Sequence, residues 1–347
     1  MIQCFALVSM LVYRSLPPRP ARQACAVTIG NFDGVHRGHR LLLARLVDAA
    51  ARLGMPSCVL TFEPHPREHF AARRPGVGAP TRIATLRDKL QALAGAGVAR
   101  TCVVHFGERF AALSAEDFVS RVLVEGLRTR HLLIGDDFRF GAQRRGDFAL
   151  LERMAATHGF DLVRMPTVTD DGARVSSSAV REALAAGALP RVERLLGRPY
   201  AISGHVVHGR KLGRTLGFPT LNLRIPHGRP ALTGIFVVQV HGLAARPLPA
   251  VASLGTRPAV ETGGAPLLET HVLDWSGDAY GRLVCVEFVR RLRDEAHYDH
   301  LDALVAQIRR DADAARAHFA AAPPVAEPDT AMTLPGAAAS AARPHGT

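Results

Sequence analysis

The sequence predicts an α/β domain with a Rossmann-like parallel sheet, followed by a small antiparallel β-barrel and a C-terminal helix. Short apolar strands alternate with amphipathic helices between residues 27 and 184, which favours a parallel sheet with helices on both faces. After residue 198 the strand candidates are closely spaced and separated by Gly and Pro, which is typical of a small barrel or sandwich. A chain of 347 residues is long enough for two domains with separate cores.

In the first half, strands and helices are expected in regular alternation. A short buried strand at 27–29 is followed by a turn with two glycines and by an amphipathic helix at 40–53, which Gly54 ends. A strand rich in apolar and β-branched residues at 57–66 then runs into a turn with two prolines. Further strands are expected at 101–106, 132–134 and 161–165, and further helices at 85–93, at 114–127 and after Gly172.

In the second half, five short strands and one helix are expected. The helix at 299–319 places Leu301, Leu304, Val305 and Ile308 on one face. The strands are expected at 201–207, 234–240, 250–254, 268–273 and 283–289.

These elements divide the chain into five segments. Residues 1–23 are expected to be an extension outside the fold, with Met10 as an alternative start, because no positive charge precedes their apolar run as it would in a signal peptide. The first domain is expected at 24–186 and the second at 199–320, joined by a linker at 187–198. Residues 321–347 consist mainly of Ala, Pro and Gly with little to bury, which predicts a disordered tail.

The composition excludes several classes of protein. With 48% apolar and 21% charged residues, the chain has a globular composition. Its net charge of +12 suits phosphate recognition, but no RNP1 motif or zinc finger is present, so we expect no nucleic-acid partner. No apolar run approaches the roughly 20 residues that span a bilayer, so we expect no membrane partner. Five scattered cysteines fit reduced thiols in a cytoplasmic protein.

The loop between the first strand and the first helix is a candidate phosphate site. Unpaired N–H groups and the positive end of the helix macrodipole attract phosphate at such a position. Gly34 and Gly38 let the backbone approach a ligand, and His36 and His39 are spaced so that both can donate to one anion. A surface turn with incidental histidines is the alternative, whereas a zinc site lacks a third ligand at a typical spacing.

Two later segments are expected beside this loop. His65 follows a strand of the parallel sheet, where ligands gather beyond the carboxyl ends of strands. Ser176 and Ser177 precede a helix and offer hydroxyl and N–H groups, while the nearby Arg174 and Arg181 can bind phosphate oxygens in fork geometry. Ordinary N-capping is the alternative for the serine run.

The segment HGRKLGRTLGFPTLNL at 208–223 is a second candidate phosphate site. Its glycines give a flexible backbone, its basic residues give positive charge, and Thr220 and Asn222 place two oxygen ligands on one face of an extended segment. It could hold a nucleoside triphosphate with Mg²⁺, although the order of residues is not that of a Walker A loop. A solvated basic hairpin is the alternative.

Six motifs resemble one family, the bacterial bifunctional riboflavin kinases/FMN adenylyltransferases. GDDFRFG at 135–141 resembles a motif that lies next to the adenylate site in the family, and RVSSSAVR at 174–181 resembles its phosphate-binding turn I-S-S-T-x-x-R. GNFDGVHRGH at 30–39 resembles the nucleotidyltransferase signature, and GRTLGFPTLNL at 213–223 resembles the riboflavin kinase motif G-R-x-L-G-F-P-T-A-N, with Leu221 in place of Ala. SLGTRPAV at 253–260 resembles a stretch that lines the flavin, and LLETHVLDWSGDAYG at 267–281 resembles the segment that carries the catalytic base.

The resemblance implies two successive reactions with ATP as co-substrate. Riboflavin is phosphorylated to FMN with Mg²⁺ in the second domain, and FMN is adenylylated to FAD in the first domain with release of pyrophosphate. Glu269 is the implied base of the kinase, and His36, His39 and Arg181 are the expected donors in adenylyl transfer. ATP and its phosphates are then expected to contact Gly30, Phe32, Asp33, Gly34, His36, His39, Asp137, Arg174, Ser176, Ser177 and Arg181 in the first domain.

In the second domain the same resemblance implies a kinase site. Its metal ligands are Thr220 and Asn222, for Mg²⁺. The flavin is expected to contact His65, Gly255, Arg257 and Glu269. The expected ATP and phosphate contacts are Gly209, Lys211, Gly213, Arg214, Gly217, Thr220 and Asn222.

Two other functions stay open at this point. One is a nucleotidyltransferase for another acceptor, such as nicotinate mononucleotide or phosphopantetheine, and the pairing of LGFPTLNL with LETH speaks against it. The other is a non-catalytic regulator that binds flavin or RNA, and the joint presence of the candidate catalytic residues speaks against that. The sequence carries no signal for an oligomeric state.

Overall fold

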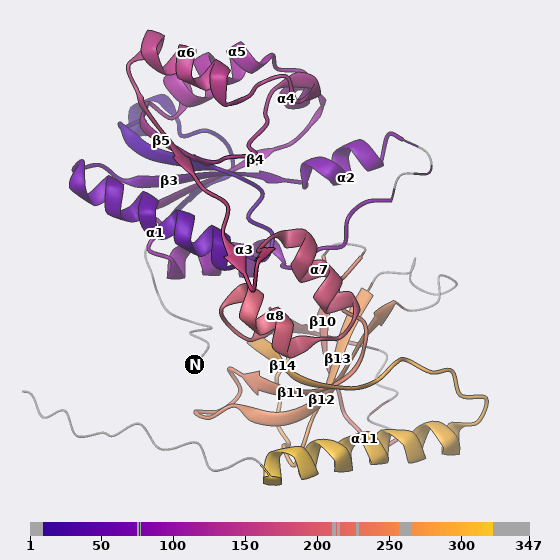
Figure 1. Cartoon of the computed structure of the whole chain (residues 1–347). Coiled ribbons are helices and arrows are strands. Elements are labelled where there is room, and N and C mark those ends of the chain that lie inside the picture. Colours follow the sequence, from indigo (N-terminus) through magenta and orange to yellow (C-terminus); the bar gives the residue numbers. More distant parts are fainter. Residues whose placement is uncertain are drawn as a thin grey trace, which may run out of the picture.

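The protein consists of a parallel-sheet half and a barrel half (Figure 1). The structure, a computed structural model, describes residues 10–74, 76, 78–209, 213, 216–226, 229–256 and 266–321. The first half contains a six-stranded sheet in the order β1-β4-β3-β2-β5-β6, and the second half is a closed barrel in the order β10-β13-β12-β11-β14-β9. This confirms the predicted fold class.

The sheet of the first half is parallel throughout. Its central strand β2 is buried along its whole length, because helices cover both faces of a parallel sheet. The strands are β1 (Leu11–Tyr13), β2 (Cys25–Ile29), β3 (Ser57–Glu63), β4 (Arg100–His105), β5 (Thr129–Gly135) and β6 (Asp161–Met165).

Helices connect these strands. The first of them, α1, begins at Arg37 and ends at Arg52, close to the predicted bounds. The sequence pattern missed α2, α4 and α6. The helices are α1 (Arg37–Arg52), α2 (Pro66–Ala71), α3 (Leu86–Gly95), α4 (Glu108–Ala111), α5 (Ala115–Asp117), α6 (Phe148–His158) and α7 (Ser177–Ala185), with a short β7–β8 hairpin (Thr169–Asp170 and Ala173–Arg174) before α7.

The predicted helix at 114–127 has an irregular form. Ser114 caps α5 by accepting a hydrogen bond from the N–H of Asp117 at 2.9 Å. Beyond Asp117 the chain continues as a π-helix from Phe118 to Gly126. The hydrophobic pattern marks a helix here, but it does not distinguish the wider winding.

The N-terminal segment contradicts the expectation that residues 1–23 lie outside the fold. Leu11–Tyr13 forms β1, which pairs in parallel with β4 at the edge of the sheet. Met10 adds to this contact, because its sulfur accepts a hydrogen bond from the Thr101 hydroxyl at 3.1 Å. A three-residue edge strand with largely exposed Leu11 gives too little periodicity for recognition from sequence.

The barrel half is built from antiparallel strands. Its helix α11 (Leu301–Ala321) packs against β11 and β12 and lies on the side of the barrel away from the parallel sheet (Figure 1). The strands are β9 (Tyr200–Val207), β10 (Leu221–Arg224), β11 (Gly234–His241), β12 (Leu248–Thr256), β13 (Pro266–Val272) and β14 (Leu283–Arg293).

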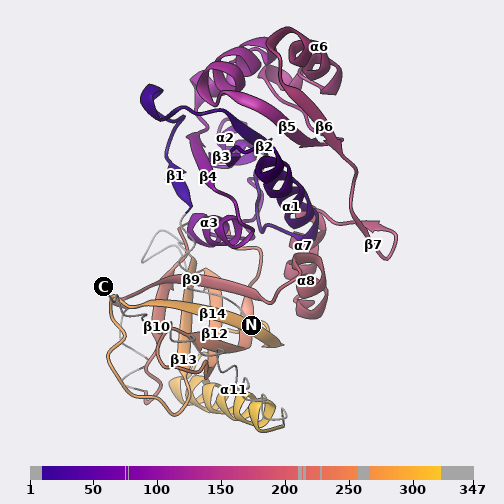
Figure 2. The same ribbon diagram turned by 90° about the vertical axis from the view of Figure 1, so that its left-hand side faces the viewer.

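Helices join the two halves. The predicted linker at 187–198 contains the helix α8 (Leu189–Leu196). Val180 of α7 and Val192 of α8 share one hydrophobic core with the barrel strands, represented by Phe236. Figure 2 shows α3, α7 and α8 between the sheet and the barrel. The connection is therefore part of a packed core.

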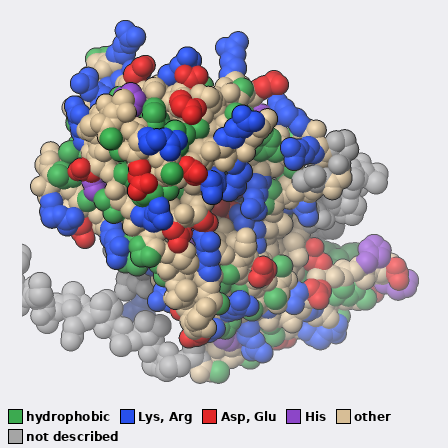
Figure 3. Space-filling view, turned by 45° about the horizontal axis from the view of Figure 1, so that its top comes forward, with side chains coloured by type: hydrophobic (Ala, Val, Ile, Leu, Met, Phe, Trp, Pro, Cys, Tyr) green, Lys and Arg blue, Asp and Glu red, His purple; other side chains and the backbone are tan. Residues whose placement is uncertain are grey.

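The described part of the chain contains no helix with both the length and the apolar character needed to cross a bilayer. On the face drawn in Figure 3, acidic side chains are interspersed among the many arginines and lysines. The predicted tail at 321–347 lies outside the described residues apart from Ala321, which ends α11.

Candidate functional site

A cleft of about 990 Å³ lies at the carboxyl ends of the parallel strands. We call it the sheet cleft. Loops after β2, β3, β4 and β5 meet there, as expected for ligand sites in open parallel sheets. Of the residues predicted to bind ATP, the cleft is lined by Gly30, Phe32, His36, His39, Asp137, Arg174, Ser176, Ser177 and Arg181.

His36 is held as the N-cap of α1. Its Nδ1 accepts a hydrogen bond from the N–H of His39 at 3.3 Å, which leaves Nε2 to carry the proton of the neutral ring. Burial lowers the pKa of His36 from 6.5 to about 4, and the positive charge of Arg174 adds to this effect. His36 is therefore a neutral hydrogen-bond donor at pH 7.

His39 stacks on His36, with 3.7 Å between the ring centroids. Burial lowers the pKa of His39 well below its ordinary value, and His36 adds to the shift. Its Nδ1 is buried and has no hydrogen-bond partner among the residues that the structure describes. The two imidazoles thus form a neutral stacked pair in the cleft wall, which offers hydrogen-bonding groups but no positive charge.

Asp33 lies beneath the cleft and does not line it, although it was predicted to contact ATP. Its carboxylate accepts hydrogen bonds from the N–H groups of Ile83 and Ala84 and pairs with Arg181 at 2.6 Å. Arg181 also donates to the carbonyl of Thr81 at 2.7 Å. Asp33 and Arg181 together fix the loop at 81–84 against the loop that follows β2.

The buried Asp33 pair should be important for stability. We expect Asp33→Ala to lower the free energy of unfolding by about 3–5 kcal/mol, because it leaves Arg181 without its partner in a buried position. The matched control is Asp170→Ala at the more exposed Arg37–Asp170 pair, which should cost at most about 1 kcal/mol. Urea unfolding followed by circular dichroism measures both, and equal losses would contradict the structural role of Asp33.

Glycine is required at position 34 of this loop. Gly34 has a φ of +83°, and a Cβ there would lie 2.7 Å from the Ile83 side chain. Like Asp33, Gly34 does not line the cleft, so its contribution is to shape the loop.

The start of α7 forms another wall of the sheet cleft. Ser176 caps this helix by accepting from the N–H of Ala179, and the Ser177 hydroxyl donates to the carbonyl of Asp33 at 3.0 Å. At the exposed rim, Arg174 pairs with Asp137 at 2.6 Å. The N-capping alternative and the phosphate-binding prediction are thus compatible, since the capped helix end faces the cleft.

An aromatic wall completes the cleft, and the sequence analysis missed it. Phe106 lies at its centre, with ring centroids 5.6 Å from Phe62 and 5.7 Å from Phe110. Phe138 and Phe140 stack at 5.4 Å on the loop after β5. The available signal was a phenylalanine at or just after the ends of β3, β4 and β5. Such a surface suits a flat aromatic ring system.

His65, predicted to contact flavin, lines the sheet cleft and not the barrel pocket. It caps α2 in a reciprocal arrangement. The His65 Nδ1 accepts a hydrogen bond from the N–H of Arg67 at 3.1 Å, and the backbone N–H of His65 donates to the Glu68 carboxylate. Burial lowers the pKa of His65 to about 4, with Arg82 as the next cause.

The lowered histidine pKa values predict a loss of stability in acid. The unfolded chain binds more protons than the folded chain between pH 6.5 and 4, so the free energy of unfolding decreases as the pH falls through this window. The loss should reach on the order of 3 kcal/mol for each of His36 and His65 at its lower end. Urea unfolding at pH 7 and pH 5 measures this loss. The double variant His36→Gln/His65→Gln should lose less free energy of unfolding between the two pH values than the wild type. Equal stability of the wild type at both pH values would contradict the prediction.

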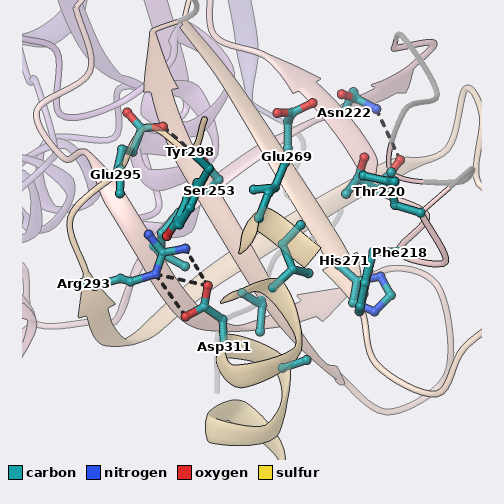
Figure 4. A pocket seen from close by; sticks show the side chains of 18 residues that line it. Phe218, Thr220, Asn222, Ser253, Glu269, His271, Arg293, Glu295, Tyr298 and Asp311 are labelled. Carbon is teal, nitrogen blue, oxygen red and sulfur yellow. Dashed lines mark hydrogen bonds and ion pairs between the residues drawn. The ribbon is translucent and has the colours of Figure 1, made fainter. Parts of the chain in front are cut away.

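A second pocket of about 290 Å³ opens between the barrel and α11. We call it the barrel pocket. Figure 4 shows Glu269, Asn222 and Thr220 on one side of it and Arg293 with Asp311 on the other. Glu269 of β13 is paired in register with Asn222 of β10, so strand pairing places these predicted residues side by side.

Asn222 is oriented for oxygen ligation. Its Nδ2 donates to the carbonyl of Thr220 at 3.2 Å, whereas its buried Oδ1 has no hydrogen-bond partner in the described ranges. A Cβ on Gly209 would lie within 2.7 Å of the Asn222 amide, which explains the glycine at that position. The unpaired Asn222 Oδ1 and the Thr220 hydroxyl are oxygen ligands of the kind that Mg²⁺ prefers.

Other predicted residues of this site lie in different places. Gly213 lines the barrel pocket, and Gly217, with a φ of +84°, forms the turn between two lining residues. Lys211, Arg214 and Arg257 lie outside the described residues.

An ionic cluster lines one side of the barrel pocket, and no sequence pattern indicated it. Arg293 binds both carboxylate oxygens of Asp311 on α11, with a closest distance of 2.6 Å. Glu295 accepts a hydrogen bond from the Ser253 hydroxyl at 3.2 Å and lies against the backbone of Gly255, a predicted flavin contact. Burial raises the pKa of Glu295, and the charge of Glu269 contributes to the shift.

Comparison with known proteins agrees with this two-site architecture. Residues 19–179 match the family model of FAD synthetase, and residues 196–319 match that of riboflavin kinase. The bifunctional riboflavin kinase/FMN adenylyltransferase of Escherichia coli strain K12 is 48% identical over 298 residues, which cover 86% of this chain and 94% of that protein. The chain belongs to this family. The Pseudomonas fluorescens member is 47% identical, again over 86% of this chain and 94% of its own length.

A solved structure has a fold similar to that of this chain. A crystal structure described as a macrolide-efflux protein from Streptococcus pneumoniae has a TM-score of 0.70 and 27% sequence identity. The match covers 89% of this chain and 99% of that one, so it extends over both halves.

Proposed function

We propose that the chain makes FAD from riboflavin in two steps, with kinase chemistry in the barrel pocket and adenylyl transfer in the sheet cleft. The observation that carries this assignment is the coexistence of two separate pockets, each lined by the motif residues of one family activity. The first domain is assigned to residues 11–186, because β1 belongs to its sheet, and the second to 199–320, and residues 187–198 connect them.

In the sheet cleft, a phosphate oxygen of FMN attacks the α-phosphorus of ATP. The new P–O bond forms while the bond from the α-phosphorus to the bridging oxygen breaks, and pyrophosphate leaves with that oxygen. FMN phosphate is already ionised, so no side-chain nucleophile is required. His36 and His39 act by positioning and by neutral hydrogen bonding, and the N-terminus of α7 and Arg174 add positive potential.

In the barrel pocket, Glu269 takes the proton of the riboflavin 5′-hydroxyl while its oxygen attacks the γ-phosphorus of ATP. The γ-phosphoryl group moves to riboflavin and ADP leaves. Thr220 and Asn222 would hold Mg²⁺, which neutralises phosphate charge when bound. The orphaned Asn222 Oδ1 supports this role, and a positioned base such as Glu269 contributes roughly 10²–10⁴-fold.

The two alternative functions fit the pockets less well. A nucleotidyltransferase for another acceptor would not need the barrel pocket with its Glu269, Thr220 and Asn222 set. A non-catalytic regulator would not need His36 and His39 held as a neutral pair. We also place the protein in the cytoplasm, since Cys25, Cys58 and Cys102 are buried thiols, as is typical of reducing compartments. We propose no nucleic-acid or membrane partner.

One assay tests the proposal. Purified protein is incubated with riboflavin, ATP and Mg²⁺, and FMN, FAD and pyrophosphate are followed by chromatography. FMN should appear first and FAD later with an equal amount of pyrophosphate, and omission of Mg²⁺ should stop the production of both. Unchanged riboflavin together with no conversion of supplied FMN would overturn the assignment.

A further inference from the structure

The loop at 30–36, between β2 and α1, has an unfavourable backbone conformation. We call it the cradle loop. Phe32 has a φ of 48° and Val35 a φ of 42°, both in the left-handed region that non-glycine residues rarely adopt. Val35 is β-branched, which makes this conformation especially costly. Such residues persist only where the surrounding structure holds them, and here they flank Asp33 and precede His36.

The carbonyl groups of this loop are held by an arginine from the other half of the chain. The Arg198 guanidinium donates to the carbonyl of Gly34 at 2.8 Å and to that of Val35 at 3.1 Å. Its planar fork suits two neighbouring acceptors. Arg198 does not line the sheet cleft, and it lies in the segment that matches riboflavin kinase, residues 196–319.

The position of Arg198 is itself fixed by the barrel. It follows Gly197, the left-handed residue that ends α8, and precedes β9 (Figure 2). The buried Tyr200 hydroxyl donates to the carbonyl of Ile83 at 3.0 Å, and the N–H of Ser203 donates to Asp88 at 3.1 Å. These contacts fix the start of β9 against the first half.

We propose that Arg198 is a positioning residue for adenylyl transfer, which holds the Gly34 and Val35 carbonyls so that Phe32 and His36 face the sheet cleft. The inference rests on the assignment of adenylyl transfer to this cleft. One face of the strained loop is held from within the first domain, where Asp33 accepts from the N–H groups of Ile83 and Ala84. The other face is held by Arg198, so FAD formation depends on a residue from the segment that leads into the barrel.

A purely structural role for Arg198 makes a different prediction. If Arg198 only joins the two halves, its loss lowers stability and affects both activities alike. If it positions the loop, its loss slows FAD formation and leaves FMN formation intact. Arg22 gives the matched control, because it also bridges two backbone carbonyls, those of Pro17 at 3.0 Å and Glu125 at 3.2 Å.

The experiment compares Arg198→Gln, Arg198→Lys and Arg22→Gln as full-length proteins. Steady-state kinetics are measured for FMN to FAD and for riboflavin to FMN, together with the thermal unfolding midpoint. Arg198→Gln should lower kcat/KM for FAD formation about 10–100-fold, mainly through kcat, because the displaced His36 acts most strongly in the transition state. Arg198→Lys should fall in between, since an ammonium group lacks the fork geometry.

FMN formation in every variant, and FAD formation in Arg22→Gln, should stay within about twofold of wild type. The inference fails if Arg198→Gln forms FAD at the wild-type rate, if both activities fall equally, or if Arg22→Gln shows the same loss. Should Arg198→Gln not fold, Arg198→Lys decides by the same criteria. Wild-type protein that forms no FAD would instead refute the proposed function.

Discussion

His39→Ala is expected to lower the rate of FAD formation by about 10²–10³-fold, or on the order of 3 kcal/mol of transition-state stabilisation, while FMN formation stays unchanged. His39 lines the cleft, and its ring stacks on that of His36 with 3.7 Å between the ring centroids. Its replacement by Ala removes the dipole of one imidazole and leaves a cavity beside the His36 ring. Kinetics with FMN and ATP measure the loss, and kinetics with riboflavin and ATP measure what remains.

The matched control for this variant is His131→Ala. His131 also lies in the parallel-sheet half with a largely buried side chain, but it does not line the sheet cleft. It should retain FAD formation within about threefold if the effect of His39 arises at the site. A similar loss in both variants would show that the effect comes from general destabilisation, and a parallel loss of FMN formation would show that the two sites are not separable.

Glu269→Gln should produce the opposite separation. The amide cannot take the proton of the riboflavin hydroxyl, so FMN formation is expected to fall about 10²–10⁴-fold. Conversion of supplied FMN to FAD should stay at the wild-type rate, because Glu269 lies in the barrel pocket and not in the sheet cleft. Both rates are measured on the same preparation.

Glu287→Gln serves as the control in the barrel. Glu287 lies on β14 and pairs with His241 at 3.0 Å, away from the lining of the barrel pocket. It should retain both activities. If Glu269→Gln kept its kinase activity, another group in the pocket would have to act as the base, and Glu295 would be the first candidate.

Much of both sites could be predicted because their residues lie in short continuous motifs. The loop at 30–39 carries its histidines within one turn of α1, and Thr220, Asn222 and Glu269 lie in two short motifs of the second half. The strand β10 and its pairing with β13 were not predicted, because the two segments are distant in the chain and only the barrel brings them together. The position of Asp33 was not predictable in this way. Its partners Ile83 and Arg181 lie 50 and 148 residues away, and only the fold brings them together.

Other features lacked a local signal for similar reasons. The aromatic wall consists of phenylalanines from separate strands, loops and helices, and none of them stands out in its own stretch of sequence. The strand β1 is three residues long, and its pairing with β4 is visible only in the folded sheet. Arg198 reads as one more arginine in a basic chain, until its two bonds to the cradle loop are seen.

The contacts at the start of β9 also bear on how such chains can be recombined. Arg198, Tyr200 and Ser203 belong to the barrel half by sequence match, yet all three bind the first half. A chimaera that joins the first half of one relative to the barrel of another at residue 196 would separate each of these side chains from the surface with which it evolved. A crossover placed after residue 203 would keep them together, and such hybrids should retain FAD synthesis more often.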